Sequence, residues 1–310
     1  ELEKRLLPAL QRLYSSLQGK AKDFDDVVKI GRTHLQDAVP LRLGQEFSAY
    51  SCMVENGIDR LKSVRSRLGQ LAIGGTAIGT GLNCPPEFAG GVVAALSAWT
   101  NIQFSEAPNK FEALAGRDAA VETSAMLKTV AVSLMKIAND LRWLSSGPRC
   151  GIGEIILPAT QPGSSIMPGK VNPVIPEAVA MIAAQVIGND TTISIGGFSG
   201  NFELNVMKPV IAYNLLQSIE LMSNGCVVLT EKCLDGLQVD RDRCKELVEK
   251  SLAMVTSLAP RIGYDQAAEL AKEAYETGST IRNVAKQNEV LSEKELAQIL
   301  DPWSMTEGGN

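Results

Sequence analysis

Apolar residues recur every three or four positions over long parts of this chain, which is the period of an α-helix. The clearest stretch has successive spacings of 3, 4, 3, 4 and 3 residues: Leu127, Val130, Leu134, Ile137, Leu141 and Leu144. Such a heptad pattern forms a seam that packs along a neighbouring helix. We therefore predict a helix over residues 111–144.

Three other segments show the helical period, over residues 41–72, 173–187 and 205–235. The segment 205–235 is apolar nearly all round, so we expect other helices to surround it. No run of alternating apolar and polar residues between hairpin signals competes with these helices. The pattern predicts an all-α fold, and so much apolar helix surface favours an oligomer over a monomer.

The composition changes near residue 238, where we predict a domain boundary. Residues 1–237 hold the long apolar segments and are predicted to form a long central helical bundle. Residues 238–310 are more charged and have shorter helical segments, so we expect a small helical C-terminal domain there. Gly- and Pro-rich connections separate the helices, and functional loops are usually found in such places.

Charge and cysteine content narrow the possible partners. The formal net charge is -5, whereas binding to nucleic acid or to an anionic membrane needs a basic face. The most apolar run, residues 178–187, is shorter than the roughly 20 residues that a membrane span needs. Six cysteines occur without a CxxC pair, which disfavours a zinc site and a disulfide framework. We therefore expect no nucleic acid, no membrane span and no metal, and thiols kept reduced in a cytosol-like compartment.

The loop over residues 163–173, with the sequence GSSIMPGKVNP, has the densest chemistry in the chain. Its two glycines and two prolines indicate an unusual backbone path. Its hydroxyls, its lysine and its amide are groups that bind carboxylates and move protons. An ordinary connecting loop would be polar without this density of functional groups, so the composition favours a functional role.

This string fits the pattern GSSxMPxKxNP, and through it the chain resembles the fumarase and aspartase superfamily. Three other blocks resemble that family in the family's order, at residues 31–37 (GRTHLQD), 79–83 (GTGLN) and 200–206 (GNFELNV). The resemblance covers the chain from about residue 1 to 300. It implies a lyase with the superfamily's long central bundle and no metal or organic cofactor. It also implies a homotetramer in which each active site draws residues from three subunits.

The resemblance assigns catalytic roles to Ser164, His34 and Glu177. Ser164 corresponds to the catalytic base on a mobile loop, with its neighbour Ser165 as the alternative, and neighbouring donors and cations must activate the hydroxyl. His34, the one histidine in the chain, lies in the GRTH block, and an imidazole exchanges protons near neutral pH. A lone histidine is more often structural, and a glutamate in a first helical turn often only complements the helix dipole. The resemblance instead makes Glu177, seven residues after the signature lysine, the partner of His34.

Four further residues are implied to bind the substrate: Thr33, Lys170, Asn172 and Ser165. Lys170 and Asn172 would hold a substrate carboxylate and stabilise the negative charge that develops when the neighbouring carbon loses a proton. Arg32, beside Thr33, is also expected to face the substrate. These groups would supply the local cations and donors that an acidic protein needs to bind a dianion.

The implied reaction is an anti addition or elimination through a carbanion (aci-carboxylate) intermediate. Fumarase-like features are Gly169 and residues 108–113, 202–209 and 262–268, whereas residues 174–177 and 188–192 are more typical of aspartase. We therefore favour the reversible hydration of fumarate to (S)-malate, a step of the tricarboxylic acid cycle. The alternatives are an aspartate ammonia-lyase (aspartase) and a non-catalytic structural relative.

One departure from the family concerns a substrate-binding block rich in serine and asparagine. Family members carry this block in a domain that precedes the point corresponding to Glu1, and nothing in the chain matches it. We therefore expect the 310-residue chain alone to be inactive or nearly so. The expected compartment is the cytoplasm, or the mitochondrial matrix in a eukaryote.

Overall fold

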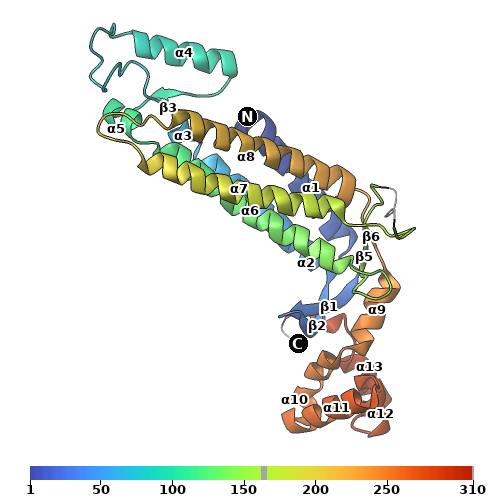
Figure 1. Ribbon diagram of the computed structural model, residues 1–310. Helices are drawn as coiled ribbons and strands as arrows, with labels where there is room; N and C mark the ends of the chain where they lie inside the picture. The colour runs from blue at the N-terminus through green and yellow to red at the C-terminus, as the bar shows by residue number, and fades with distance from the viewer. Residues whose placement is uncertain (162–165, 309–310) are drawn as a thin grey trace. The chain divides into compact units, whose positions relative to one another are not determined.

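The computed structural model describes residues 1–161 and 166–308 (Figure 1). This part of the chain divides into two compact units. The first unit contains residues 1–14, 52–140 and 173–233, and the second contains residues 15–51, 141–172 and 234–310. Both units join segments that are distant in the sequence, so the predicted boundary between two continuous domains at residue 238 stays a prediction.

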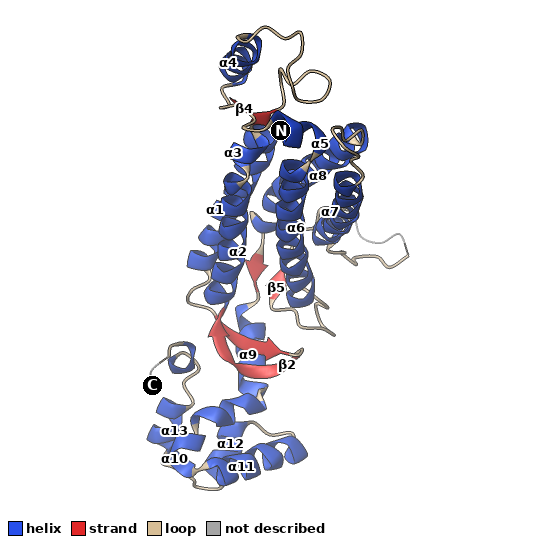
Figure 2. Cartoon of the chain, turned by 90° about the vertical axis from the view of Figure 1, so that its left-hand side faces the viewer, coloured by secondary structure: helices blue, strands red, loops and turns tan. Residues whose placement is uncertain are grey.

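Helices dominate both units, as the all-α prediction required, and the strands drawn red in Figure 2 are short. The elements up to residue 234 are η1 (Leu2–Leu6), α1 (Leu7–Asp23), α2 (Leu43–Ser63), α3 (Arg65–Leu68), α4 (Phe88–Thr100), α5 (Lys110–Ala115), α6 (Asp118–Leu144), α7 (Val174–Phe198), α8 (Lys208–Leu229) and η2 (Thr230–Leu234). The later helices are α9 (Arg241–Lys250), η3 (Leu252–Ser257), α10 (Ala259–Ile262), α11 (Tyr264–Thr277), α12 (Ile281–Gln287), α13 (Glu293–Ile299) and η4 (Ser304–Thr306).

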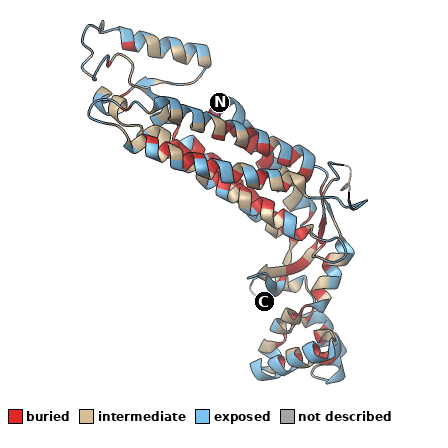
Figure 3. Ribbon diagram, in the orientation of Figure 1, coloured by how far each residue is buried: buried red, intermediate tan, exposed pale blue. Residues whose placement is uncertain are grey.

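Helix α6 carries the predicted heptad seam. All six seam residues are buried, the most exposed of them, Leu144, to only 4%. Figure 3 shows such buried stripes along the long helices. The helix begins at Asp118 rather than at residue 111, because Gly116 has an extended backbone (φ -82°, ψ 172°) that ends α5. The prediction of a long amphipathic helix is confirmed, and its predicted start was wrong.

Helices α7 and α8 pack along each other in the first unit. Helix α7 extends to Phe198, eleven residues beyond the predicted end at residue 187, and runs through two adjacent glycines. A Cβ at Gly196 would lie 2.8 Å from Ile211 Cγ1 on α8, and one at Gly197 would lie 2.6 Å from Val121 Cγ2 on α6. These glycines therefore allow close helix packing, which outweighs their poor helix propensity.

Within the described chain, α8 is not enclosed by other helices as its composition predicted, since Tyr213 is 66% exposed and Leu216 is 51% exposed. Its neighbour α7 is also partly uncovered. Met181 is 70% exposed and Phe198 is 78% exposed. By length and composition alone α7 is apolar enough to cross a membrane, and the same is true of core helices of soluble proteins, so this is weak support for a span. The predicted oligomer would cover this apolar face.

The strands form three small two-stranded sheets. Strands β1 (Val28–Thr33) and β2 (Gln36–Arg42) form an antiparallel hairpin, β3 (Gln70–Leu71) pairs in parallel with β4 (Ser105–Glu106), and β5 (Ile155–Ile156) pairs antiparallel with β6 (Gln238–Val239). The β1–β2 hairpin was not expected from the sequence. Its turn residues, His34 and Leu35, are not the Asn-Gly or Asp-Gly pair that signals a hairpin.

The C-terminal helices share a core with the hairpin in the second unit. Ile30 of β1 is 1% exposed and belongs to the same buried cluster as residues from α9, η3 and α11–α13. Side chains cap two of these helices: Asp240 accepts from the Arg243 N–H at the start of α9, and Ser292 forms a capping box with Glu295 at α13. The hairpin is therefore packed on one side against the C-terminal helices.

Candidate active site

Thr33 and His34 lie at the end of the β1–β2 hairpin, and both are exposed. Thr33 pairs with Gln36, which leaves His34 and Leu35 as a two-residue turn. Both turn residues have positive φ, 56° at His34 and 60° at Leu35, as a type I′ turn requires. A bulky residue with positive φ is uncommon and is often found at functional sites. The turn therefore presents the single histidine on a constrained backbone.

Gly31 shifts the register of the hairpin just before this turn. Ile30 pairs with Pro40 but Arg32 pairs with Asp37, so the two strands contribute unequal numbers of residues between these pairs. A Cβ at Gly31 would lie 2.6 Å from the carbonyl oxygen of Val39, so only glycine fits at this position. Such an irregularity redirects the side chains that follow it.

A buried charge cluster lies beneath the turn and consists of Lys29, Arg32, Glu46 and Glu154. The Arg32 guanidinium donates to both oxygens of Glu154, with Nη1–Oε2 and Nη2–Oε1 distances of 2.9 and 3.2 Å. Lys29 Nζ lies 3.3 Å from Glu154 Oε2 and 3.3 Å from Glu46 Oε2, and it donates to the Ile30 carbonyl oxygen at 2.9 Å. The guanidinium of Arg32 is thus held by a buried carboxylate, and the expectation that Arg32 faces the substrate stays a prediction.

Glu154 is itself fixed through its backbone. Its N–H donates to the Leu144 carbonyl oxygen at the end of α6, and its carbonyl oxygen accepts from the Asp240 N–H at 3.0 Å. The next residue, Ile155, begins β5. The Cys244 thiol lies 3.8 Å from the Glu154 carbonyl oxygen, and burial, followed by the charge of Glu154, raises the pKa of that thiol to about 12. Glu154 could not be identified from a local sequence pattern, because its partner Arg32 is 122 residues away.

Lys170 and Asn172 lie in the second half of the signature loop, in exposed positions of the second unit. The Lys170 N–H donates to the Met167 carbonyl oxygen at 3.2 Å, with Pro168 and Gly169 between them. Gly169 has a φ of 81°, so proline and glycine occupy the two positions that a type II turn prefers for them. This turn determines where the chain presents Lys170. Among the described residues, the side chains of Lys170, Asn172 and His34 form no hydrogen bond or ion pair.

Glu177 lies in the first turn of α7, where its N–H donates to the Pro173 carbonyl oxygen and its side chain is partly buried. A carboxylate there is favoured by the helix dipole. Glu177 belongs to the first unit and His34 to the second, so their predicted pairing stays a prediction. Ser164 and Ser165 lie outside the described residues.

The block at residues 200–206 has a packing role in the first unit. The Asn205 side-chain amide donates to the carbonyl oxygens of Gly196 and Gly197 at 3.0 Å, which closes the end of α7. Arg117 donates to the carbonyl oxygens of Ala113 and Leu114 at the end of α5, and partial burial lowers the pKa of Arg117. This arginine was not identified from the sequence. Its hydrogen bonds to the last carbonyl groups of α5 help to end that helix before α6 begins.

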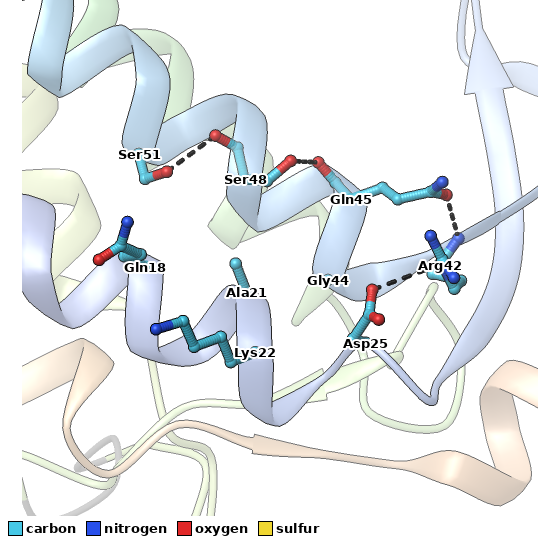
Figure 4. A pocket seen from close by; sticks show the side chains of 9 residues that line it. All are labelled: Gln18, Ala21, Lys22, Asp25, Arg42, Gly44, Gln45, Ser48 and Ser51. Carbon is cyan, nitrogen blue, oxygen red and sulfur yellow. Dashed lines mark hydrogen bonds and ion pairs between the residues drawn. The ribbon is translucent and has the colours of Figure 1, made fainter.

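A separate hollow of about 500 Å³ lies beside α1 and the start of α2 in the second unit (Figure 4). Its polar side chains bind one another: Arg42 Nε lies 3.4 Å from Asp25 Oδ1, and the Arg42 N–H donates to Gln45 Oε1. Arg42 also stacks on Trp303 and pairs with Glu307. No predicted site residue lines this hollow. Through Trp303 and Glu307, Arg42 connects the end of β2 to the C-terminal segment.

Comparison with known proteins identifies the class of protein that has this fold and these blocks. A lyase family model matches residues 1–188, and a model described as the fumarase C C-terminus matches residues 254–307. The chain belongs to the class II fumarase branch of this lyase family. This confirms the resemblance seen in the sequence.

The similarity to individual fumarases extends over nearly the whole chain. The chain is 52% identical to fumarate hydratase 2 of Arabidopsis thaliana, over 98% of this chain and 61% of that protein. It is also 52% identical to the class II fumarate hydratase of Xylella fastidiosa (strain Temecula1), over 98% of this chain and 64% of that one. A solved class II fumarase from Schistosoma mansoni superposes with a TM-score of 0.95 at 41% identity, covering 99% of this chain and 67% of the other. The chain thus spans less than two thirds of the curated relatives' length.

Proposed function

We propose that this chain is part of an enzyme that catalyses the reversible hydration of fumarate to (S)-malate. The observation that carries the proposal is the 52% identity to fumarate hydratases over 98% of the chain. The exposed Thr33–His34 turn and the exposed Lys170 and Asn172 support it, because these side chains remain available for a small dianion.

In the direction of dehydration, the Ser164 hydroxyl group in its deprotonated form removes the proton from the carbon beside one malate carboxylate. The electron pair moves into that carboxylate to give the aci-carboxylate, and Lys170 and Asn172 stabilise its additional negative charge. The carbon–oxygen bond then breaks, the double bond forms, and the leaving hydroxyl group takes a proton from His34 to depart as water. Glu177 holds the imidazolium that exists before this transfer.

Thr33 and Ser165 complete the proposed substrate contacts. Because both carboxylates of the substrate must be held while the charge moves, several fixed donors are needed in addition to Lys170. We also propose that the enzyme is a homotetramer with active sites shared between subunits, and that it acts in the cytoplasm or in the mitochondrial matrix. The apolar side chains exposed on α7 support an oligomer.

The test uses a reconstituted enzyme, in which the chain is fused to the part of the Xylella fastidiosa fumarate hydratase that it does not cover. Fumarate is followed by its ultraviolet absorbance. The substitution His34→Asn removes the proton-exchanging group, so kcat should fall by roughly 10²- to 10⁴-fold.

A second pair of variants tests substrate binding. Lys170→Gln should raise KM and lower kcat, because it removes a cation from the proposed carboxylate site. Its control is Lys272→Gln, whose side chain is 75% exposed on α11, and which should leave both constants unchanged. Equal effects of the two lysine substitutions would contradict the assignment of Lys170.

A further inference from the structure

We propose that Glu154 is a positioning residue for this reaction: by holding Arg32, it fixes the hairpin turn that presents Thr33 and His34. The inference rests on the proposed function for its catalytic consequence. Its structural basis, the anchoring of the turn, rests on contacts within the second unit alone.

The first argument is the geometry of the Arg32–Glu154 pair. The two parallel hydrogen bonds, at 2.9 and 3.2 Å, fix both the distance and the plane of the guanidinium. Arg32 lies one residue before Thr33 and two before His34, so the backbone that enters the turn is held at a defined point. A single hydrogen bond would leave this point free to rotate.

The second argument is the burial and charge of the cluster. The Glu154 side chain is 0% exposed and that of Lys29 is 2% exposed, while Glu46 adds a second carboxylate at 22%. The charges of the two cations therefore neutralise those of the two carboxylates. Buried charges add little net stability compared with an apolar core, although the loss of one partner is strongly destabilising. Burying these four charged groups has a high desolvation free energy, so the cluster contributes little to stability. Its presence is better explained by the defined geometry that it gives to the turn.

The third argument is where Glu154 leads along the chain. Its backbone is hydrogen-bonded to the end of α6 and to Asp240, and the chain continues through β5 towards the signature loop. Glu154 is thus a fixed point shared by the His34 turn and by the segment that leads to Lys170. Changes at Glu154 should disturb the turn without touching any substrate-binding side chain.

Two substitutions test the inference. Arg32→Lys keeps the positive charge but loses the two-pronged hydrogen bond, so it should fold while the turn is held less firmly. Glu154→Gln removes the buried negative charge and is the more destabilising of the two. The matched control is Arg241→Lys, since Arg241 also binds a carboxylate with two hydrogen bonds of 2.9 Å, to Asp26, but the pair is exposed.

The first readout is made on the tag-free chain and does not depend on activity. His34 is the only histidine, so ¹³C-labelled histidine gives one imidazole resonance. Arg32→Lys should shift or broaden this resonance and speed hydrogen exchange at residues 28–42, whereas Arg241→Lys should change neither. A loss of overall stability alone would not move the resonance of the folded protein.

The second readout is kcat in the reconstituted enzyme, measured per folded active site. Displacement of a catalytic group by about 1 Å lowers rates by as much as about 100-fold, so Arg32→Lys should lower kcat by roughly 10- to 100-fold. An unchanged His34 resonance, or a wild-type kcat per folded site, would overturn the inference. If the parent enzyme hydrates no fumarate, the proposed function fails, and the resonance and exchange data still decide whether Glu154 anchors the turn.

Discussion

At the scale of single residues, a positive φ occurs in the candidate site both at a glycine and at a residue with a side chain. Gly169 adopts a φ of 81° in the turn before Lys170, where glycine has no steric penalty. Leu35 adopts a φ of 60° in the hairpin turn, where a side chain is unfavourable by about 1–2 kcal/mol. The strain at Leu35 is compensated by the rest of the hairpin, including the buried charge cluster.

Replacing Leu35 by glycine should therefore stabilise the chain. Leu35 is 64% exposed, so little apolar burial is lost. The relief of backbone strain exceeds the extra conformational entropy that a glycine loses on folding. We expect the free energy of unfolding to rise by about 0.5–1 kcal/mol. Urea denaturation measures the change.

The control for this substitution is Leu82→Gly. Leu82 is 73% exposed and does not have a positive φ, so glycine there should only lower the free energy of unfolding. A similar loss in both variants would show that the turn is unstrained.

The buried cysteines make the free energy of unfolding decrease as pH rises in the alkaline range. Burial raises the pKa of Cys226, Cys233 and Cys244 from the ordinary 9.0 to about 12. Below pH 9 the thiols are protonated in both states. Between about pH 9 and 12 the unfolded chain releases protons that the folded chain retains, so the free energy of unfolding falls as pH rises.

Denaturation curves between pH 8 and 10 test this sign. Replacing Cys226 by alanine should make the decline with pH shallower. The same substitution at the exposed Cys52 should leave the slope as it is. An equal slope in all three proteins would rule out the raised thiol pKa as its cause.

The role of a residue could be predicted from the sequence only where the residue lies in a recognisable block of neighbouring residues. The position of His34 in the GRTH block identified it as a candidate although it is a single histidine. Glu154 could not be identified in this way, because its importance depends on a contact with Arg32 across 122 residues. The contact of Arg32 with Glu154 could not be predicted for the same reason.

At the scale of elements, the seam of α6 was the most predictable feature of the fold. Its period is local, and the pairing of apolar faces determines that the seam is buried. The hairpin was missed, since its two turn residues adopt positive φ under the control of tertiary contacts rather than of their own preferences. The length of α7 was also missed, because Gly196 and Gly197 end helices in isolation but permit close packing here.

The seam predicts large differences between neighbouring positions of α6. Ile137 is fully buried, so Ile137→Ala should lower the free energy of unfolding by about 2–5 kcal/mol. Val132 on the same helix is 53% exposed, and Val132→Ala should change it by no more than about 0.5 kcal/mol. Chemical denaturation of the two variants compares them directly, and similar losses would contradict the assigned seam.

At the scale of the whole molecule, the described site residues come from both compact units. Thr33, His34, Lys170 and Asn172 belong to the second unit and Glu177 to the first. The relatives are longer than this chain, which spans 61–64% of the two plant and bacterial fumarate hydratases. We therefore expect the 310-residue chain by itself to show little or no turnover.

The fold class and the family were predictable from the sequence because helical period and signature blocks are local patterns. The assembly of the site was not, because it depends on how segments far apart in the chain come together.

The most direct test of the proposed function is the formation of fumarate by the reconstituted enzyme, followed by ultraviolet absorbance with (S)-malate and separately with aspartate. We predict that fumarate forms from malate and not from aspartate, and that the isolated chain is inactive with both. Fumarate formed from aspartate but not from malate, or no turnover of either substrate by the reconstituted enzyme, would contradict the proposed hydratase.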